Sequence, residues 1–276
     1  MTTPSDPPEH LSSTVTPTVP VSPSSTVGSD ERVSPSSTVG SDERVAPGAP
    51  VAPGAPVWPA GPVELVIFDC DGVLVDSERL AVRVEVQLLG EFGWQLSEAE
   101  VLDRFVGRSD AHMLSTVEAE LGRAVPEFMD LYRARLFEAF ESELRVVAGV
   151  VDVLDQLERD GVATCVASSG THAKMTRTLG LTGLWDRFDG RIFSATEVER
   201  GKPEPDLFLF AAAAMGVGRE RCVVVEDSRA GITAARAAGM RSVGYAGGLT
   251  PAAWLQGELT VVIDEMADLA PMLASR

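Results

Sequence analysis

Two aspartates stand one residue apart directly after an apolar run, in the stretch VIFDCDGVLVDSE at residues 66–78. An ionised carboxylate is costly in an apolar interior unless it is paired or coordinates a metal ion. Asp69 and Asp71 therefore predict a reactive site at the end of a buried strand. There, one carboxylate could act as a nucleophile and the other could transfer protons.

Further polar residues follow other apolar runs of the chain. They are Ser168 and Ser169 in ATCVASSG, Lys202 in ERGKPEPD, and Glu226 and Asp227 in CVVVEDS. If these runs are parallel strands, their carboxyl ends share one edge of a sheet, which is where ligands bind in such folds. We therefore expect these side chains to converge with the two aspartates on one cleft.

The expected cluster suits a divalent cation and a phosphate group. Carboxylates packed together repel one another and recruit a cation, and a set of ligands made only of oxygens favours Mg²⁺. The hydroxyl of Ser168, the ammonium of Lys202 and free amides at a loop-to-helix junction could donate to phosphate oxygens. With the phosphoryl group neutralised in this way, a carboxylate can attack phosphorus and form an aspartyl-phosphate.

The elements that must position these residues alternate from Pro62 onward. Alternating strands and helices predict an α/β fold whose parallel sheet is covered on both faces. Pro203 and Pro205 are expected in the first turn of the third helix. The predicted strands are 63–69, 163–168, 190–195, 222–227, 241–246 and 260–264, and the predicted helices are 149–160, 171–180, 204–216 and 229–238.

Residues 78–148 interrupt this alternation with several amphipathic helical segments and no strand candidate. Because the insertion follows the first strand, we expect it to lie above the carboxyl end of that strand. The predicted organisation is a catalytic core formed by residues 61–77 and 149–276, with a helical cap at 78–148. Arg108 of the cap is a candidate contact for an anionic group of a substrate, and a surface salt bridge is the alternative.

The first sixty residues differ from the rest of the chain. SPSSTVGSDERV occurs at 22–33 and again at 34–45, and APGAPV occurs at 46–51 and again at 52–57. Segments dominated by Pro, Ser, Thr and Gly bury too little apolar surface to offset their ordering entropy. We interpret residues 1–60 as a disordered low-complexity tail.

Composition limits the classes of partner. The chain has 276 residues and a formal net charge of −18, which disfavours nucleic acids and anionic membrane surfaces as partners. No apolar run approaches the roughly 18 residues of a membrane span, and the N-terminus has no secretory signal pattern. We therefore expect a cytoplasmic protein, and a monomer because no second apolar surface stands out.

Four segments, in order, resemble the motifs of the haloacid dehalogenase-like superfamily: FDCDGVLVDSE, VASSG, GKPEPDLF and VVVEDS. The match spans roughly residues 63 to 248, and the helical insertion resembles the C1 cap of that superfamily. The resemblance implies a Rossmann-like core with an inserted α-helical cap. The segments FDCDG and FVGRS look most like the subfamily IA branch that contains phosphogluconate phosphatases and β-phosphoglucomutases.

The resemblance also implies roles for the acidic residues. Asp69 would be the nucleophile, and Asp71 would be the general acid and base. Asp69, Asp227 and the backbone carbonyl of Asp71 would bind Mg²⁺. Glu226 would orient ligand or water, or contact the metal.

Ser168, Ser169 and Lys202 would hold the phosphate. The implied activity is Mg²⁺-dependent hydrolysis of a small phosphorylated metabolite, a sugar or sugar-acid phosphate, through an aspartyl-phosphate. The alternative is a phosphosugar mutase of the β-phosphoglucomutase type. Mutases of that type carry a histidine on the first cap helix, where this sequence has Ala81, and this difference favours water as the phosphoryl acceptor.

Overall fold

The computed structural model describes residues 61–106 and 110–274. In these ranges six strands form one sheet in the order β3-β2-β1-β4-β5-β6, and every neighbouring pair is parallel. The strands are β1 (Leu65–Phe68), β2 (Ala163–Ser168), β3 (Ile192–Ser194), β4 (Cys222–Glu226), β5 (Arg241–Tyr245) and β6 (Thr260–Ile263). The strand order reverses between β1 and β4, and ligands bind at such a point in open α/β sheets.

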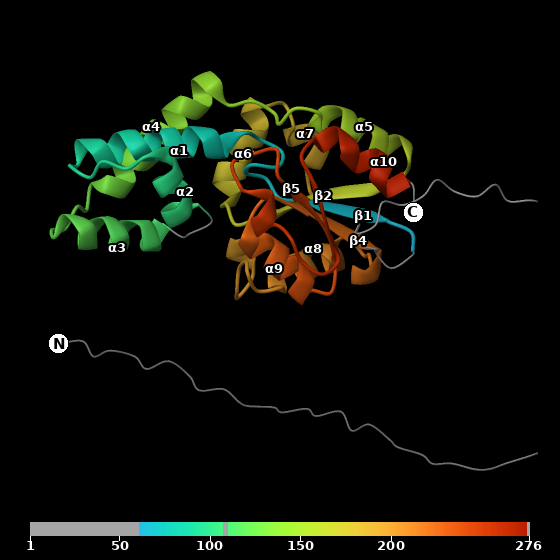
Figure 1. Cartoon of the computed structure of the whole chain (residues 1–276). Coiled ribbons are helices and arrows are strands. Elements are labelled where there is room, and N and C mark those ends of the chain that lie inside the picture. Colours follow the sequence, from blue (N-terminus) through green and yellow to red (C-terminus); the bar gives the residue numbers. More distant parts are fainter. Residues whose placement is uncertain (1–60, 107–109, 275–276) are drawn as a thin grey trace, which may run out of the picture. The chain divides into compact units, whose positions relative to one another are not determined.

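Helices cover both faces of this sheet (Figure 1). On one face lie α8 (Asp206–Ala214) and α9 (Arg229–Ala237), and on the other lie α5 (Val150–Arg159), α6 (His172–Leu181), α7 (Trp185–Phe188) and α10 (Leu269–Ala274). The predicted α/β fold with a Rossmann-like parallel sheet is therefore confirmed.

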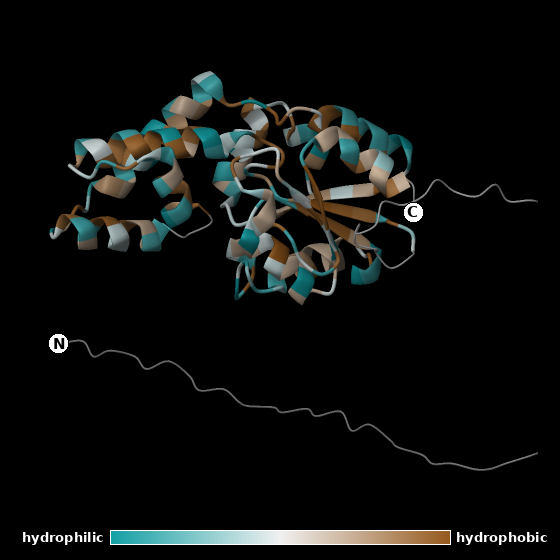
Figure 2. Cartoon of the chain, viewed as in Figure 1, coloured by the Kyte–Doolittle hydropathy of each residue, from teal (hydrophilic) through white to brown (hydrophobic). Residues whose placement is uncertain are grey.

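The position of strand β1 between two layers of helices explains why its sequence is apolar without interruption. Val66 and Phe68 pack in the core under α5 and α6, whereas Leu65 and Ile67 pack in the core under α8 and α9. Successive side chains of a strand point to opposite faces, so a strand covered on both faces is buried throughout. Figure 2 shows the resulting hydrophobic strands between helices whose outer surfaces are hydrophilic.

Four helices stand between β1 and α5 and are here called the inserted helices. They are α1 (Ser77–Glu91), α2 (Glu98–Phe105), α3 (Asp110–Leu121) and α4 (Phe128–Glu143). Figure 1 shows them grouped beside the sheet, coloured cyan to green. Ser97 starts α2 with a capping box, in which its hydroxyl accepts from the backbone N–H of Glu100 and the Glu100 carboxylate accepts from the N–H of Ser97. Two ion pairs, Arg83–Glu143 and Arg135–Glu91, join α1 to α4.

The predicted strands are all present: β2 has the predicted bounds, and the other five are shorter by one to three residues. Neither Pro203 nor Pro205 lies in the first turn as predicted, because α8 begins only at Asp206 and Pro205 is its N-cap. A turn closed by the Glu204 N–H and the Gly201 carbonyl occupies the preceding residues. The sequence pattern also missed the short helices α7 and α10.

Residues 1–60, predicted to be a disordered tail, lie outside the described residues. Within 61–106 and 110–274, none of the helices combines the length and the apolar composition needed to cross a membrane.

Candidate active site

A cavity of about 840 Å³ lies between the carboxyl ends of the strands and the inserted helices. Its lining includes side chains from both parts of the chain. The predicted site residues that line it are Asp69, Asp71, Ser168, Ser169, Lys202, Glu226 and Asp227. The structure therefore brings these candidates together at one edge of the sheet, whereas Arg108 lies outside the described residues.

Lys202 links two acidic candidates. Its Nζ donates to Asp69 Oδ1 at 2.6 Å and to Glu226 Oε1 at 2.7 Å, and only 4% of its side chain is exposed. Burial alone would lower the pKa of Lys202, but the two carboxylates outweigh burial and raise it. Burial also raises the pKa of Asp69 to about 7, against the opposing effect of the Lys202 ammonium.

Glu226 is fully engaged by protein groups. Its Oε1 accepts from Lys202, and its Oε2 accepts from the backbone N–H of Ser228 at 2.7 Å. Ser228 in turn caps α9, because its Oγ accepts from the N–H of Gly231 at 3.0 Å. Each oxygen of Glu226 thus accepts one hydrogen bond, and through the first of these Glu226 fixes the position of Lys202.

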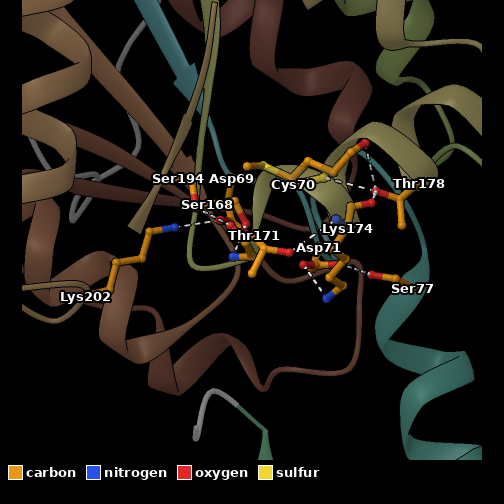
Figure 3. Close-up of polar contacts among 12 residues, drawn as sticks. Asp69, Cys70, Asp71, Ser77, Ser168, Thr171, Lys174, Thr178, Ser194 and Lys202 are labelled. Atoms are coloured by element: carbon orange, nitrogen blue, oxygen red, sulfur yellow. Dashed lines mark hydrogen bonds and ion pairs between the residues drawn. The ribbon is translucent and has the colours of Figure 1, made fainter. Parts of the chain in front are cut away.

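The Asp71 carboxyl has two donors, as Figure 3 shows. Its Oδ1 accepts from Ser77 Oγ at 2.7 Å, and its Oδ2 accepts from Lys174 Nζ at 2.8 Å. Burial alone would raise the pKa of Asp71, but Lys174 and Ser77 outweigh burial and lower it. Sequence reasoning gave neither partner a role. Ser77 lies in the first quoted stretch, but Lys174 gave no signal apart from its closeness to Ser168.

The loop after β2 leads into the N-terminus of α6 and presents backbone amides. Ser168 Oγ accepts from the N–H of Gly170 at 3.1 Å, and Ser194 Oγ donates to the Gly170 carbonyl at 2.7 Å. Thr171 caps α6 by accepting from the N–H of Lys174. These contacts fix a loop at a helix N-terminus, a geometry that suits an anion (Figure 3).

A second group of carboxyls surrounds Gly72, whose φ is +74°. A Cβ built on Gly72 would lie 1.9 Å from Asp227 Oδ2 and 3.2 Å from Glu78 Cδ. Burial raises the pKa of Glu78 to about 8, and burial together with Glu78 raises the pKa of Asp227. Sequence reasoning assigned no role to Glu78, although it ends the first quoted stretch.

These residues fit a magnesium ion. Asp227 Oδ2 is buried and has no hydrogen-bond partner in the part of the chain that the structure describes. Burial is the largest cause of the raised pKa values of Asp69 and Asp227, and neighbouring carboxyls add to it, so a bound cation would stabilise the ionised forms of both. No three His, Cys, Asp or Glu side chains of the described residues form a closed metal site. The predicted set of magnesium ligands needs only two carboxylates, those of Asp69 and Asp227, and the backbone carbonyl of Asp71 is its third oxygen ligand.

Comparisons with known proteins identify the family of this chain. A family model described as haloacid dehalogenase-like hydrolase matches residues 66–245. The chain is 37% identical over 180 residues to the 6-phosphogluconate phosphatase of Escherichia coli (strain K12), an alignment that covers 64% of this chain and 80% of that protein. It is 30% identical over 180 residues to hexitol phosphatase B of the same strain, with 64% of this chain and 81% of that protein covered.

A solved structure also resembles this chain. The crystal structure of a HAD family hydrolase from Deinococcus radiodurans R1, with bound phosphate and sodium, matches with a TM-score of 0.68 and 32% identity. The match covers 78% of this chain and 96% of that chain. The family match and the phosphatase relatives confirm the predicted enzyme class, a phosphoric monoester hydrolase. Its motifs, its fold and these matches show that the chain belongs to the haloacid dehalogenase-like hydrolase family.

Proposed function

We propose that this protein is a Mg²⁺-dependent phosphatase that hydrolyses a small sugar or sugar-acid phosphate through an aspartyl-phosphate. The observation that carries the proposal is the position of Asp69. It follows the central strand β1, lines the cavity and has one oxygen 2.6 Å from the Lys202 ammonium. The relatives named 6-phosphogluconate phosphatase and hexitol phosphatase B support a phosphorylated sugar derivative as substrate.

In the first step the Asp69 carboxylate attacks phosphorus, and the phosphoryl group passes from the substrate oxygen to Asp69. Lys202, Ser168 and the amides of the loop before α6 donate to the phosphoryl oxygens. Asp71 gives a proton to the departing alcohol. Loss of the Lys174 contact on substrate binding favours the protonated Asp71, because burial alone raises its pKa.

In the second step water attacks the aspartyl-phosphate. Asp71, now ionised, accepts a proton from this water, and phosphate leaves as Asp69 is restored. Asp69, Asp227 and the carbonyl of Asp71 would hold Mg²⁺, whose charge would offset the repulsion between the nucleophile and the phosphate.

The inserted helices would act as a cap over these steps. Val82, Met113 and Leu136 of these helices line the cavity, and closure around a substrate would exclude bulk water. Ala81 also lines the cavity, and no histidine of the described residues does so. An alanine methyl group transfers no proton, so this position supports hydrolysis over the mutase alternative.

The first test measures phosphate release with Mg²⁺ across a panel of phosphorylated sugars, sugar acids and polyols. Parallel assays use EDTA, Asp69→Asn and the control Asp189→Asn, which changes an exposed carboxylate outside the cavity. We expect Mg²⁺-dependent release that is lost in Asp69→Asn and kept in Asp189→Asn. Each assay is also analysed for phosphosugar isomers.

Retained turnover in Asp69→Asn would contradict the assignment of the nucleophile. Isomerisation of a phosphosugar with little phosphate release would contradict the phosphatase and identify a mutase.

A further inference from the structure

The inserted helices hold a buried acid that the proposed chemistry does not use. Glu85 of α1 lines the cavity, although only 5% of it is exposed. Its Oε1 accepts from the hydroxyl of Tyr132 on α4 at 2.9 Å. Its Oε2 is buried and has no hydrogen-bond partner in the described residues. An acceptor left unsatisfied beside a cavity is costly, and a ligand that donates to it would remove that cost.

The cavity lining around Glu85 and Tyr132 is mostly apolar. Val82, Met113 and Phe140 are buried and line the same cavity. A few polar groups in a mostly apolar pocket usually fix the orientation of a ligand. Tyr132 also lines the cavity, and its hydroxyl oxygen keeps acceptor capacity while it donates to Glu85.

The charges at this end of the cavity disfavour an anion. Arg133 lines the cavity, but its guanidinium forms ion pairs with Asp110 at 2.8 Å and with Asp130 at 3.5 Å, which offset its charge. Burial raises the pKa of Glu85 to about 7, and the charge of Asp110 adds to this effect. Near neutral pH the Glu85 carboxyl is therefore present in both forms, one that only accepts hydrogen bonds and one that also donates.

We propose that Glu85 and Tyr132 bind hydroxyl groups of the substrate and select a neutral sugar or polyol phosphate over a sugar-acid phosphate. This inference rests on the proposed phosphatase function. A hydroxyl both donates and accepts, so it matches Glu85 and Tyr132 together. Rotation about the last bond of the Glu85 side chain costs little and presents either oxygen to the cavity. A carboxylate has no proton to donate, and the ionised form of Glu85 would repel it.

The test uses two substrates that differ only at the end remote from the phosphate. Glucitol 6-phosphate ends in a hydroxymethyl group, and 6-phosphogluconate ends in a carboxylate. Phenyl phosphate, which has no hydroxyl beyond the phosphate, serves as the third substrate. The variants are Glu85→Gln and Tyr132→Phe, with Glu138→Gln as the control, because Glu138 lies on the same helix as Tyr132 but is exposed and outside the cavity.

We expect the wild type to prefer glucitol 6-phosphate over 6-phosphogluconate in kcat/KM by about tenfold or more, since one hydrogen bond to a charged group has that effect. In Glu85→Gln this ratio falls by about tenfold, mainly through KM, because the amide neither repels the carboxylate nor accepts as strongly. Tyr132→Phe reduces the ratio in the same direction, and Glu138→Gln leaves it unchanged. Thermal melting of each variant verifies folding.

A wild-type preference for 6-phosphogluconate would overturn the inference. An equal loss on all three substrates in Glu85→Gln would also overturn it, because that result indicates a purely structural role. In both cases phosphate release by the wild type would leave the proposed phosphatase intact. Absence of Mg²⁺-dependent release from every substrate, including the wider panel, would remove the proposed function and this inference together.

Discussion

At the scale of single residues, Asp69 and Asp71 show how neighbouring groups give two similar carboxyls different pKa values. Burial raises the pKa of Asp69 to about 7, and Glu226 adds to this effect. At Asp71 the donors Lys174 and Ser77 outweigh burial and lower the pKa. Carboxyls whose environments move their pKa values apart are suited to different roles. Without a bound cation these shifts run opposite to the proposed roles, because a nucleophile must be ionised and a general acid must be protonated. A Mg²⁺ ion beside Asp69 would lower the pKa of that carboxyl.

Gly72 offers a test of how closely the Asp227 carboxyl is held. We expect Gly72→Ala to lower kcat/KM by about a hundredfold, because the added Cβ would stand 1.9 Å from Asp227 Oδ2 and displace it. Weaker binding of Mg²⁺, measured by titrating activity against the metal, should accompany the loss.

Gly93→Ala is the matched control. Gly93 also has a positive φ, of +99°, but a Cβ there would meet nothing within 4 Å. Both variants introduce a strain of about 1–2 kcal/mol from the left-handed backbone. Equal loss of activity in the two variants would show that strain, and not contact with Asp227, controls the site.

At the scale of elements, Glu85 and Tyr132 join α1 to α4 and make the packing of these helices sensitive to pH. The pKa of Glu85 is about 7 in the folded chain, above its ordinary value of 4.5, because of burial and the charge of Asp110. Between these two values the folded state keeps a proton that the unfolded state has released. The contribution of Glu85 to stability should therefore be greatest below pH 4.5 and fall as the pH rises to about 7, by about 3 kcal/mol.

Glu85→Gln removes this titration. We expect its melting temperature to depend less on pH between about 5 and 7 than that of the wild type, and to exceed the wild-type value at pH 8. Thermal melts across this range measure the difference, with the exposed Glu138→Gln as the control. Parallel melting curves for wild type and Glu85→Gln would contradict a raised pKa at this residue.

At the scale of the whole molecule, the described strands and all cavity residues follow Gly61. Deleting residues 1–60 should therefore leave kcat/KM unchanged and the melting temperature within about 2 °C of the full chain. The two proteins are compared by phosphate release and by calorimetry. A large loss of either property would show that these residues contribute to the active protein.

A slightly longer deletion provides the contrast. The buried Arg241 donates to the carbonyls of Gly61 and Pro62. Removal of residues 1–62 takes away both acceptors and leaves Glu64 in place, and we expect a loss of about 1–3 kcal/mol. If both deletions melt alike, the contacts of Arg241 at this end of the chain contribute little to stability.

Much of this protein was predictable because the information is local. An uninterrupted apolar run such as 65–68 specifies a strand buried on both faces, and the residues that follow such runs must meet at one sheet edge. That rule predicted that Asp69, Ser168 and Asp227 meet at one site, and all three line one cavity of the structure.

The partners of these residues were decided by tertiary structure. Lys174 meets Asp71 across 103 residues, and Tyr132 meets Glu85 across 47. A helical pattern tells which residues face inward, but it does not tell which inward side chain of another element will meet them. The pKa of each buried acid depends on those contacts between distant residues. The sequence by itself therefore determined which groups could do the chemistry, and the packing of distant elements decided which of them are charged, paired or available to a substrate.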